Sequence, residues 1–124
     1  MVGQYILFRK TRKMNKPTRF YSNKQEKKVA KAVGGKQTAN SGATAFQKGD
    51  VISDLFLIEC KTRIGPSRSM TIQKDWIVKN QEEAFAMGKL YSAVAIDFGD
   101  SENYYLIDEN LFKYLVSRLK EDEQ

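Results

Sequence analysis

The sequence predicts a mixed α/β (α+β) fold in a single domain, with one β-sheet flanked by helices. Three observations lead to this prediction. The chain has 124 residues, enough for one domain with a single modest core. Short apolar runs rich in strand-favouring residues alternate with segments whose apolar residues recur at helical spacing. No internal repeat or linker divides the chain, so we expect all strands to join one sheet.

The first 21 residues are predicted to form a basic arm outside the packed domain. Residues 4–8 have the composition of a short strand, but residues 9–19 are basic and polar and contain Pro17. Residues 1–36 hold eleven Lys or Arg and one acid, whereas the remaining 88 residues hold ten basic and fourteen acidic residues. This asymmetry within a net charge of +6 predicts a polyanionic partner. The alternative is a charged arm that only aids solubility.

A helix is expected over Ser22–Val33. Ser22 and Gln25 fit a capping box, and Gly34 provides the stop. Helical spacing places Glu26 on the same face as the apolar residues around Val29. An acid on a buried face needs a partner, either a Lys or Arg or a metal centre.

An apolar hairpin is expected next. Residues 51–52 and 55–58 are strand-like, and Ser53-Asp54 is turn chemistry. With these two residues as the turn, Asp50 lies opposite Leu57.

That register places three charged side chains, Asp50, Glu59 and Lys61, on one face of the hairpin. Asp50 and Glu59 would lie diagonally, roughly 7–8 Å apart. Two buried carboxylates repel each other, and a divalent cation removes the conflict. Lys61 could steady a nucleophilic water or developing phosphorane charge. The alternative is a Glu59–Lys61 ion pair, with Asp50 beginning a turn.

The second half of the chain predicts a helix, two strands and a final helix. Thr71 is expected to cap the first helix, which runs to about Met87 and stops at Gly88, and residues 93–98 and 104–107 are strands. Asp108 caps the final amphipathic helix. The side chains expected to point inward are Ile72, Trp76, Ile77, Asn80, Ala84 and Met87 in the first helix and Leu111, Phe112, Leu115, Val116 and Leu119 in the second, with Lys79 and Glu83 as an exposed pair.

Composition narrows the possible chemistry. The chain has no histidine and one cysteine, Cys60, which excludes Ser-His-Asp and Cys-His catalysis and zinc sites built on these residues. Residues 34–47 form a Gly- and Ser-rich loop without P-loop spacing. We expect neither a membrane span nor a signal peptide, and therefore a cytoplasmic protein.

These features together resemble a known family. A helix carrying Glu26, then Asp50, then Glu59-Cys60-Lys61, then a helix and further strands is similar to the PD-(D/E)xK nuclease superfamily. The small size, the basic start and the Asn40-Ser41-Gly42-Ala43 loop make the chain most like archaeal-type and phage Holliday-junction resolvases. The similarity covers residues 22–107, and Gly49 replaces the proline of the motif.

The resemblance implies a restriction-endonuclease-like sheet in a nuclease-like domain over residues 22–120, followed by an acidic tail at 121–124. It implies Asp50, Glu59 and the Cys60 carbonyl as ligands of Mg²⁺ or Mn²⁺, Lys61 as the catalytic lysine, and Glu26 as the helical acid that completes the site. The residues expected to contact DNA are Ser41 and Gln81, by resemblance, and the basic Lys10, Arg12, Lys13, Lys36 and Arg63.

The function that the resemblance implies is metal-dependent hydrolysis of DNA phosphodiesters, with a four-way junction or other branched DNA as substrate. A homodimer would make paired cuts, and a phage-encoded protein would act in the host cytoplasm. Two alternatives stay open: a nuclease of other DNA structure or sequence specificity on the same fold, and a non-catalytic basic nucleic-acid-binding protein.

Overall fold

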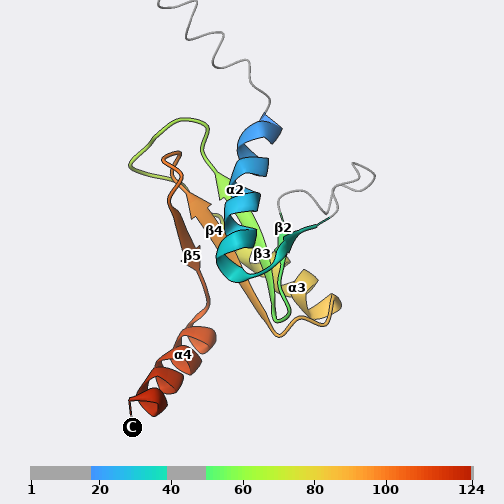
Figure 1. Cartoon of the computed structure of the whole chain (residues 1–124), viewed down its shortest axis with the longest axis vertical. Helices are drawn as coiled ribbons and strands as arrows, with labels where there is room; N and C mark the ends of the chain where they lie inside the picture. Colours follow the sequence, from blue (N-terminus) through green and yellow to red (C-terminus); the bar gives the residue numbers. More distant parts are fainter. Residues whose placement is uncertain (1–17, 39–49, 124) are drawn as a thin grey trace, which may run out of the picture.

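A five-stranded mixed sheet with the order β1-β2-β3-β4-β5 lies at the centre of the protein (Figure 1). The structure, a computed structural model, describes residues 18–38 and 50–123. The predicted α+β class and single domain are confirmed. The elements of the described part are α2 (Thr18–Val33), β1 (Lys36–Gln37), β2 (Asp50–Ile52), β3 (Phe56–Thr62), α3 (Lys74–Ala86), β4 (Tyr91–Asp97), β5 (Asn103–Leu106) and α4 (Glu109–Asp122).

The strands β2 and β3 form the predicted hairpin, but in a different register. Asp50 pairs directly with Glu59 rather than with Leu57. The Ser53 backbone donates to Phe56 O, and the Ser53 hydroxyl accepts from Phe56 N. The turn therefore moves one residue along, which shifts each partner by two. A shift of two keeps every side chain on its predicted face.

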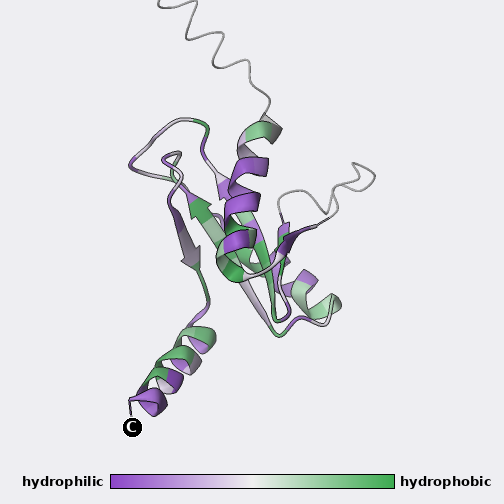
Figure 2. Cartoon of the chain, in the orientation of Figure 1, coloured by the Kyte–Doolittle hydropathy of each residue, from purple (hydrophilic) through white to green (hydrophobic). Residues whose placement is uncertain are grey.

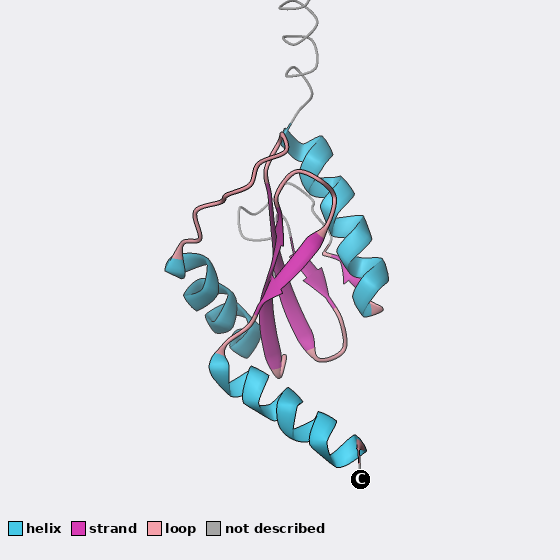
Figure 3. Ribbon diagram, turned by 90° about the vertical axis from the view of Figure 1, so that its left-hand side faces the viewer, coloured by secondary structure: helices cyan, strands magenta, loops and turns pink. Residues whose placement is uncertain are grey.

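The two faces of the sheet are covered by different helices (Figure 3). β3 and β4 are parallel, and α3 makes the crossover between them. On the other face, α2 packs on a core that includes Val29, Ile58 and Ala95. Side chains alternate along a strand, so Leu57, Glu59 and Lys61 belong to the face that α3 covers.

Helix α2 begins at Thr18, inside the segment predicted to be an arm, so the predicted start at Ser22 is wrong. Gln25 is not a cap: it is buried, and its amide donates to the carbonyls of Lys61 and Ala95. The predicted end is confirmed, because Gly34 has a φ of 68° and the next residue donates back to Ala30 O. Strand β1, which follows at once, was predicted to be loop.

Helix α3 begins at Lys74 with Gln73 as its N-cap, so the predicted cap at Thr71 is wrong, and it ends before Gly88 as expected. Ile72 therefore precedes the helix and is exposed, and Met87 is also exposed, so both predictions of an inward side chain are wrong. Asn80 is buried as predicted, and its amide donates to Leu57 O and Ala93 O on the two central strands.

Helix α4 starts as predicted, because the Asp108 side chain accepts a hydrogen bond from Leu111 N at 2.8 Å. Tyr114 stacks on Tyr91, with ring centroids 6.1 Å apart. Of the five residues predicted to point inward, only Leu111 is buried. The helix extends away from the sheet (Figure 1), and Phe112, Leu115 and Leu119, which belong to its apolar positions (green ribbon in Figure 2), remain exposed. It also continues to Asp122, into the predicted tail.

Several predictions lie outside the described residues. These are the strand at residues 4–8, most of the basic arm with Lys10, Arg12 and Lys13, and the loop that carries Ser41. Among the residues that are described, no helix has the length and apolar character needed to cross a membrane.

Candidate active site

Asp50 and Glu59 face each other across the antiparallel strands β2 and β3. Directly opposed residues have Cβ atoms about 4.5–5.5 Å apart. Their neighbours Val51 and Ile58 point into the core beneath α2, so both carboxylates lie on the α3 side. Asp50 is only 5% exposed, and Glu59 is half-buried. The structure thus brings the two predicted acids closer together than the diagonal placement expected from the sequence.

Burial and neighbouring acids disfavour the ionised form of this pair. The pKa of Asp50 rises from 3.8 to about 7, because of burial first and then the negative charges of Glu83, Glu59 and Glu26, which Lys61 opposes. The pKa of Glu59 is raised by burial, an effect that Lys61 opposes. The site therefore holds negative charge at a cost that a cation would relieve.

Lys61 does not form the ion pair that was the alternative reading of the hairpin. Its ammonium nitrogen lies 4.8 Å from the centre of the Trp76 ring on α3, within the range of a cation–π interaction. No ion pair joins Lys61 to Glu59, although both are described. Trp76 was expected to be a core residue, but it is half-buried and supports the lysine.

Glu26 is 1% exposed on α2, which confirms its predicted place on the buried face. Its Oε1 accepts a hydrogen bond from Gln37 Nε2 at 3.1 Å, and the same amide donates to Asn23 Oδ1 at 2.7 Å. β1 thus helps to fix the position of Glu26. The negative charge of Glu26 raises the pKa of Asp50, so Glu26 acts electrostatically on one member of the carboxylate pair.

A divalent cation fits the two paired carboxylates. Glu59 Oε2 is buried and has no hydrogen-bond partner among the described residues, so an acceptor is available there for a cation. Mg²⁺ in proteins commonly uses one or two carboxylates and completes its shell with water and phosphate oxygens. Within residues 18–38 and 50–123, no three or more Asp, Glu, Cys or His side chains are arranged to hold a metal. Direct ligation by Glu26 therefore stays a prediction.

Cys60 can contribute only its backbone carbonyl to such a centre. The side chain points into the core beneath α2, and burial raises the pKa of its thiol. A neutral, buried thiol is a poor metal ligand. The use of the Cys60 carbonyl as a ligand stays a prediction.

Glu83 on α3 is the acid that sequence reasoning missed. It was interpreted as an exposed partner of Lys79, yet it is half-buried and exerts the strongest charge effect on Asp50. No ion pair joins Glu83 to Lys79, and Lys79 instead lowers the pKa of Glu59. Sequence spacing could have indicated its position, because Glu83 follows the buried Asn80 by three residues and therefore lies on the same side of the helix.

Comparisons with family models, with curated proteins and with solved structures found no match. The interpretation of the site therefore depends on its own geometry and charge.

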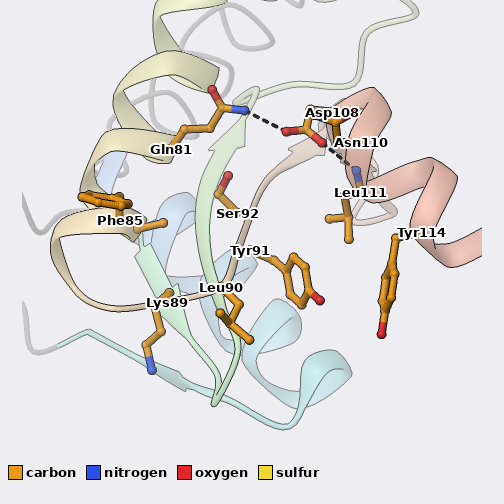
Figure 4. A pocket seen from close by; sticks show the side chains of 11 residues that line it. Gln81, Phe85, Lys89, Leu90, Tyr91, Ser92, Asp108, Asn110, Leu111 and Tyr114 are labelled. Carbon is orange, nitrogen blue, oxygen red and sulfur yellow. Dashed lines mark hydrogen bonds between the residues drawn. The ribbon is translucent and has the colours of Figure 1, made fainter.

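The predicted DNA-contacting residues are distributed over several surfaces. Gln81 donates to Asp108 Oδ2 at 3.1 Å, so its amide is held at the start of α4 (Figure 4). Lys36 is exposed on the edge strand β1. Arg63 is exposed just after β3 and lines a hollow of about 270 Å³ together with Lys24 and Lys28 of α2.

Proposed function

We propose that the protein is an endonuclease that hydrolyses DNA phosphodiesters with the help of Mg²⁺ or Mn²⁺, on a sheet of the restriction-endonuclease type. The observation that carries this proposal is the direct pairing of buried Asp50 with Glu59, with Lys61 one side-chain step away on the same face. A carboxylate pair whose pKa values are raised is a costly arrangement for structure alone. Strongly perturbed acids in such clusters are typical of functional sites.

The chain's own groups would divide the work as follows. A bound divalent cation supplies positive charge for the scissile phosphate and lowers the pKa of water. Asp50 and Glu59, with the Cys60 carbonyl, would hold the cation. Lys61, kept in place by Trp76, would donate hydrogen bonds to the attacking water or to the phosphate oxygens as negative charge develops. Glu26 would complete the site formed by Asp50 and Glu59, and the hydrogen bond from Gln37 would fix the position of its carboxylate.

The proposed substrate is branched DNA, a four-way junction in particular, bound by a homodimer that makes paired cuts. The exposed lysines of α2 support a polyanionic partner, because Lys24, Lys27, Lys28 and Lys31 all reach solvent on one helix. We extend the same proposal to a cytoplasmic site of action, including the host cytoplasm for a phage-encoded protein.

A nicking assay on a four-way junction with Mg²⁺ tests the proposal. The wild type should cleave, and Asp50→Asn and Lys61→Ala should each lose roughly a hundredfold or more in rate. Asp54→Asn is the matched control, because Asp54 is an exposed acid in the turn of the same hairpin. Cleavage by Asp50→Asn or Lys61→Ala at the wild-type rate would overturn the assignment.

A non-catalytic DNA-binding protein is the second candidate, favoured by the exposed lysines of α2 alone. It predicts salt-dependent junction or duplex binding, no cleavage with Mg²⁺ or Mn²⁺, and no loss of binding in Glu59→Gln. A nuclease of other specificity is distinguished by rates on junction, flap, duplex and single-stranded DNA.

A further inference from the structure

Helix α4 carries an apolar stripe that no other described element covers. Phe112, Leu115 and Leu119 follow one another at intervals of three and four residues, so they lie on one side of the helix. They are 59%, 41% and 64% exposed. A helix of 14 residues is marginal in water unless its apolar face is packed. The stripe therefore needs a cover.

An apolar groove of about 330 Å³ opens at the base of the same stripe. Leu111 and Leu115 form its wall on the α4 side. The opposite wall includes Val33 at the end of α2, Phe56 at the start of β3 and Ile107 just after β5. Each chain thus presents the apolar stripe of α4 next to an apolar groove that could receive apolar side chains of a second stripe.

The charges beside the stripe favour a second copy in an antiparallel orientation. Glu109 lies in the first turn of α4 and Lys120 in the last. They are eleven residues apart, about three helical turns, and so share one flank of the stripe. Antiparallel pairing brings each Glu109 beside the partner's Lys120 and sets the two helix dipoles in opposition.

We infer that a second copy of this chain covers α4, in a two-fold dimer in which each α4 stripe enters the groove of the other copy. Such a contact is the same in both directions, so it closes after two copies and leaves no free apolar end. The surface deepens the proposed function, because it supplies the homodimer that paired cutting requires. Its test needs neither metal nor DNA, so either proposal can fail without the other.

Light scattering coupled to gel filtration on the full chain tests this inference. At about 50 µM, the wild type should have twice the chain mass of 14.2 kDa. Phe112→Glu and Leu119→Glu should have the mass of one chain, because each places a charge in the apolar contact. Circular dichroism would verify that these variants are folded.

Two control variants should stay dimeric. Ile64→Glu changes another exposed apolar side chain (45%), which lies beyond the other end of β3. Ser117→Glu adds the same charge on the side of α4 away from the stripe. A one-chain mass for the wild type contradicts the inference, as does a dimer that both stripe variants leave intact.

Amide exchange of the wild type provides a measurement that does not depend on variants. The amides of α4 should exchange more slowly as the protein concentration rises from about 1 to 100 µM. Slow exchange that is independent of concentration would show that the chain covers its own stripe, for example with residues 1–17. That outcome would overturn the inference.

Discussion

At the scale of single residues, the site is dominated by the cost of ionising Asp50. A carboxyl whose pKa is raised by folding is ionised more easily in the unfolded chain, so its ionisation opposes folding above the unfolded pKa. The contribution of Asp50 to the free energy of unfolding therefore becomes less favourable as the pH rises toward its folded-state pKa of about 7. A residue kept in this position despite that cost is expected to serve something other than stability.

The first prediction follows from the raised pKa of Asp50. Without metal, the protein should gain stability as the pH falls from 8 to 5.5, by on the order of 1–2 kcal/mol from Asp50. Asp50→Asn should be more stable than the wild type at pH 8 and lose most of this dependence. Urea unfolding at the two pH values measures both effects.

Asp54→Asn is the control for that experiment, because it removes an exposed acid in the turn of the same hairpin. It should keep the wild-type pH dependence. If Asp50→Asn proved less stable than the wild type at pH 8, Asp50 would be a structural acid and the account of the site would be wrong.

The second prediction concerns Trp76, which positions Lys61. Trp76→Leu should slow cleavage several-fold while leaving junction binding unchanged, because a cation–π contact of about 1 kcal/mol is lost. Trp76→Phe, which keeps an aromatic face, should recover part of the rate. Equal losses in both variants, or a loss of DNA binding, would assign Trp76 a packing role instead.

At the scale of elements, the hairpin shows that sequence alternation predicts the face of each side chain but not the register of the two strands. Alternation along β3 identified the face of Glu59 and Lys61, because that depends only on a period of two. The register was wrong by two residues, because Ser53, Asp54 and Leu55 allow turns at adjacent positions and local chemistry does not choose between them. The observed register is set by the Ser53–Phe56 hydrogen bonds and by the pairing of β3 with β4 in the sheet.

In the helices too, local sequence predicts burial and helix ends but not how one element lies against another. The burial of Glu26 followed from its spacing to Val29, and the end of α2 followed from Gly34. The place of Glu83 depends on how α3 lies across the sheet, which its own sequence does not encode. For α4, amphipathicity predicted an apolar face correctly but could not say what covers it.

The third prediction belongs to α3 and its connection to the sheet. Asn80→Ala should destabilise the protein by about 1–3 kcal/mol, because it removes both hydrogen bonds to Leu57 O and Ala93 O in a buried place. Lys79→Ala, one residue away and exposed, should change stability little. Chemical denaturation measures both, and equal effects would show that the two hydrogen bonds contribute nothing.

At the scale of the whole molecule, positive charge and the acidic site belong to different parts of one small domain. Lys24 and Lys28 of α2 line a hollow together with Arg63 at the end of β3, and the paired carboxylates lie on the other face of the sheet. Under the proposed function, DNA binding and phosphodiester hydrolysis would therefore depend on separate groups of side chains.

The fourth prediction tests this separation. Lys24→Ala, Lys28→Ala and Arg63→Ala should each weaken junction binding and lower the slope of log affinity against log salt by about one. Lys113→Ala, an exposed lysine on α4, should leave the slope unchanged. Fluorescence anisotropy over a salt series in Ca²⁺ measures the slopes. Equal slopes for all four variants would remove the hollow from the DNA-binding surface.

Calorimetric titration of Mn²⁺ into the metal-free protein at pH 8 tests the central claim most directly, that Asp50 and Glu59 together hold a divalent cation. The account predicts that the wild type and Asp54→Asn bind Mn²⁺ alike, and that Asp50→Asn and Glu59→Gln lose this binding. Mn²⁺ binding by Asp50→Asn with the wild-type affinity, or none by the wild type at millimolar Mn²⁺ even with junction DNA present, would contradict it.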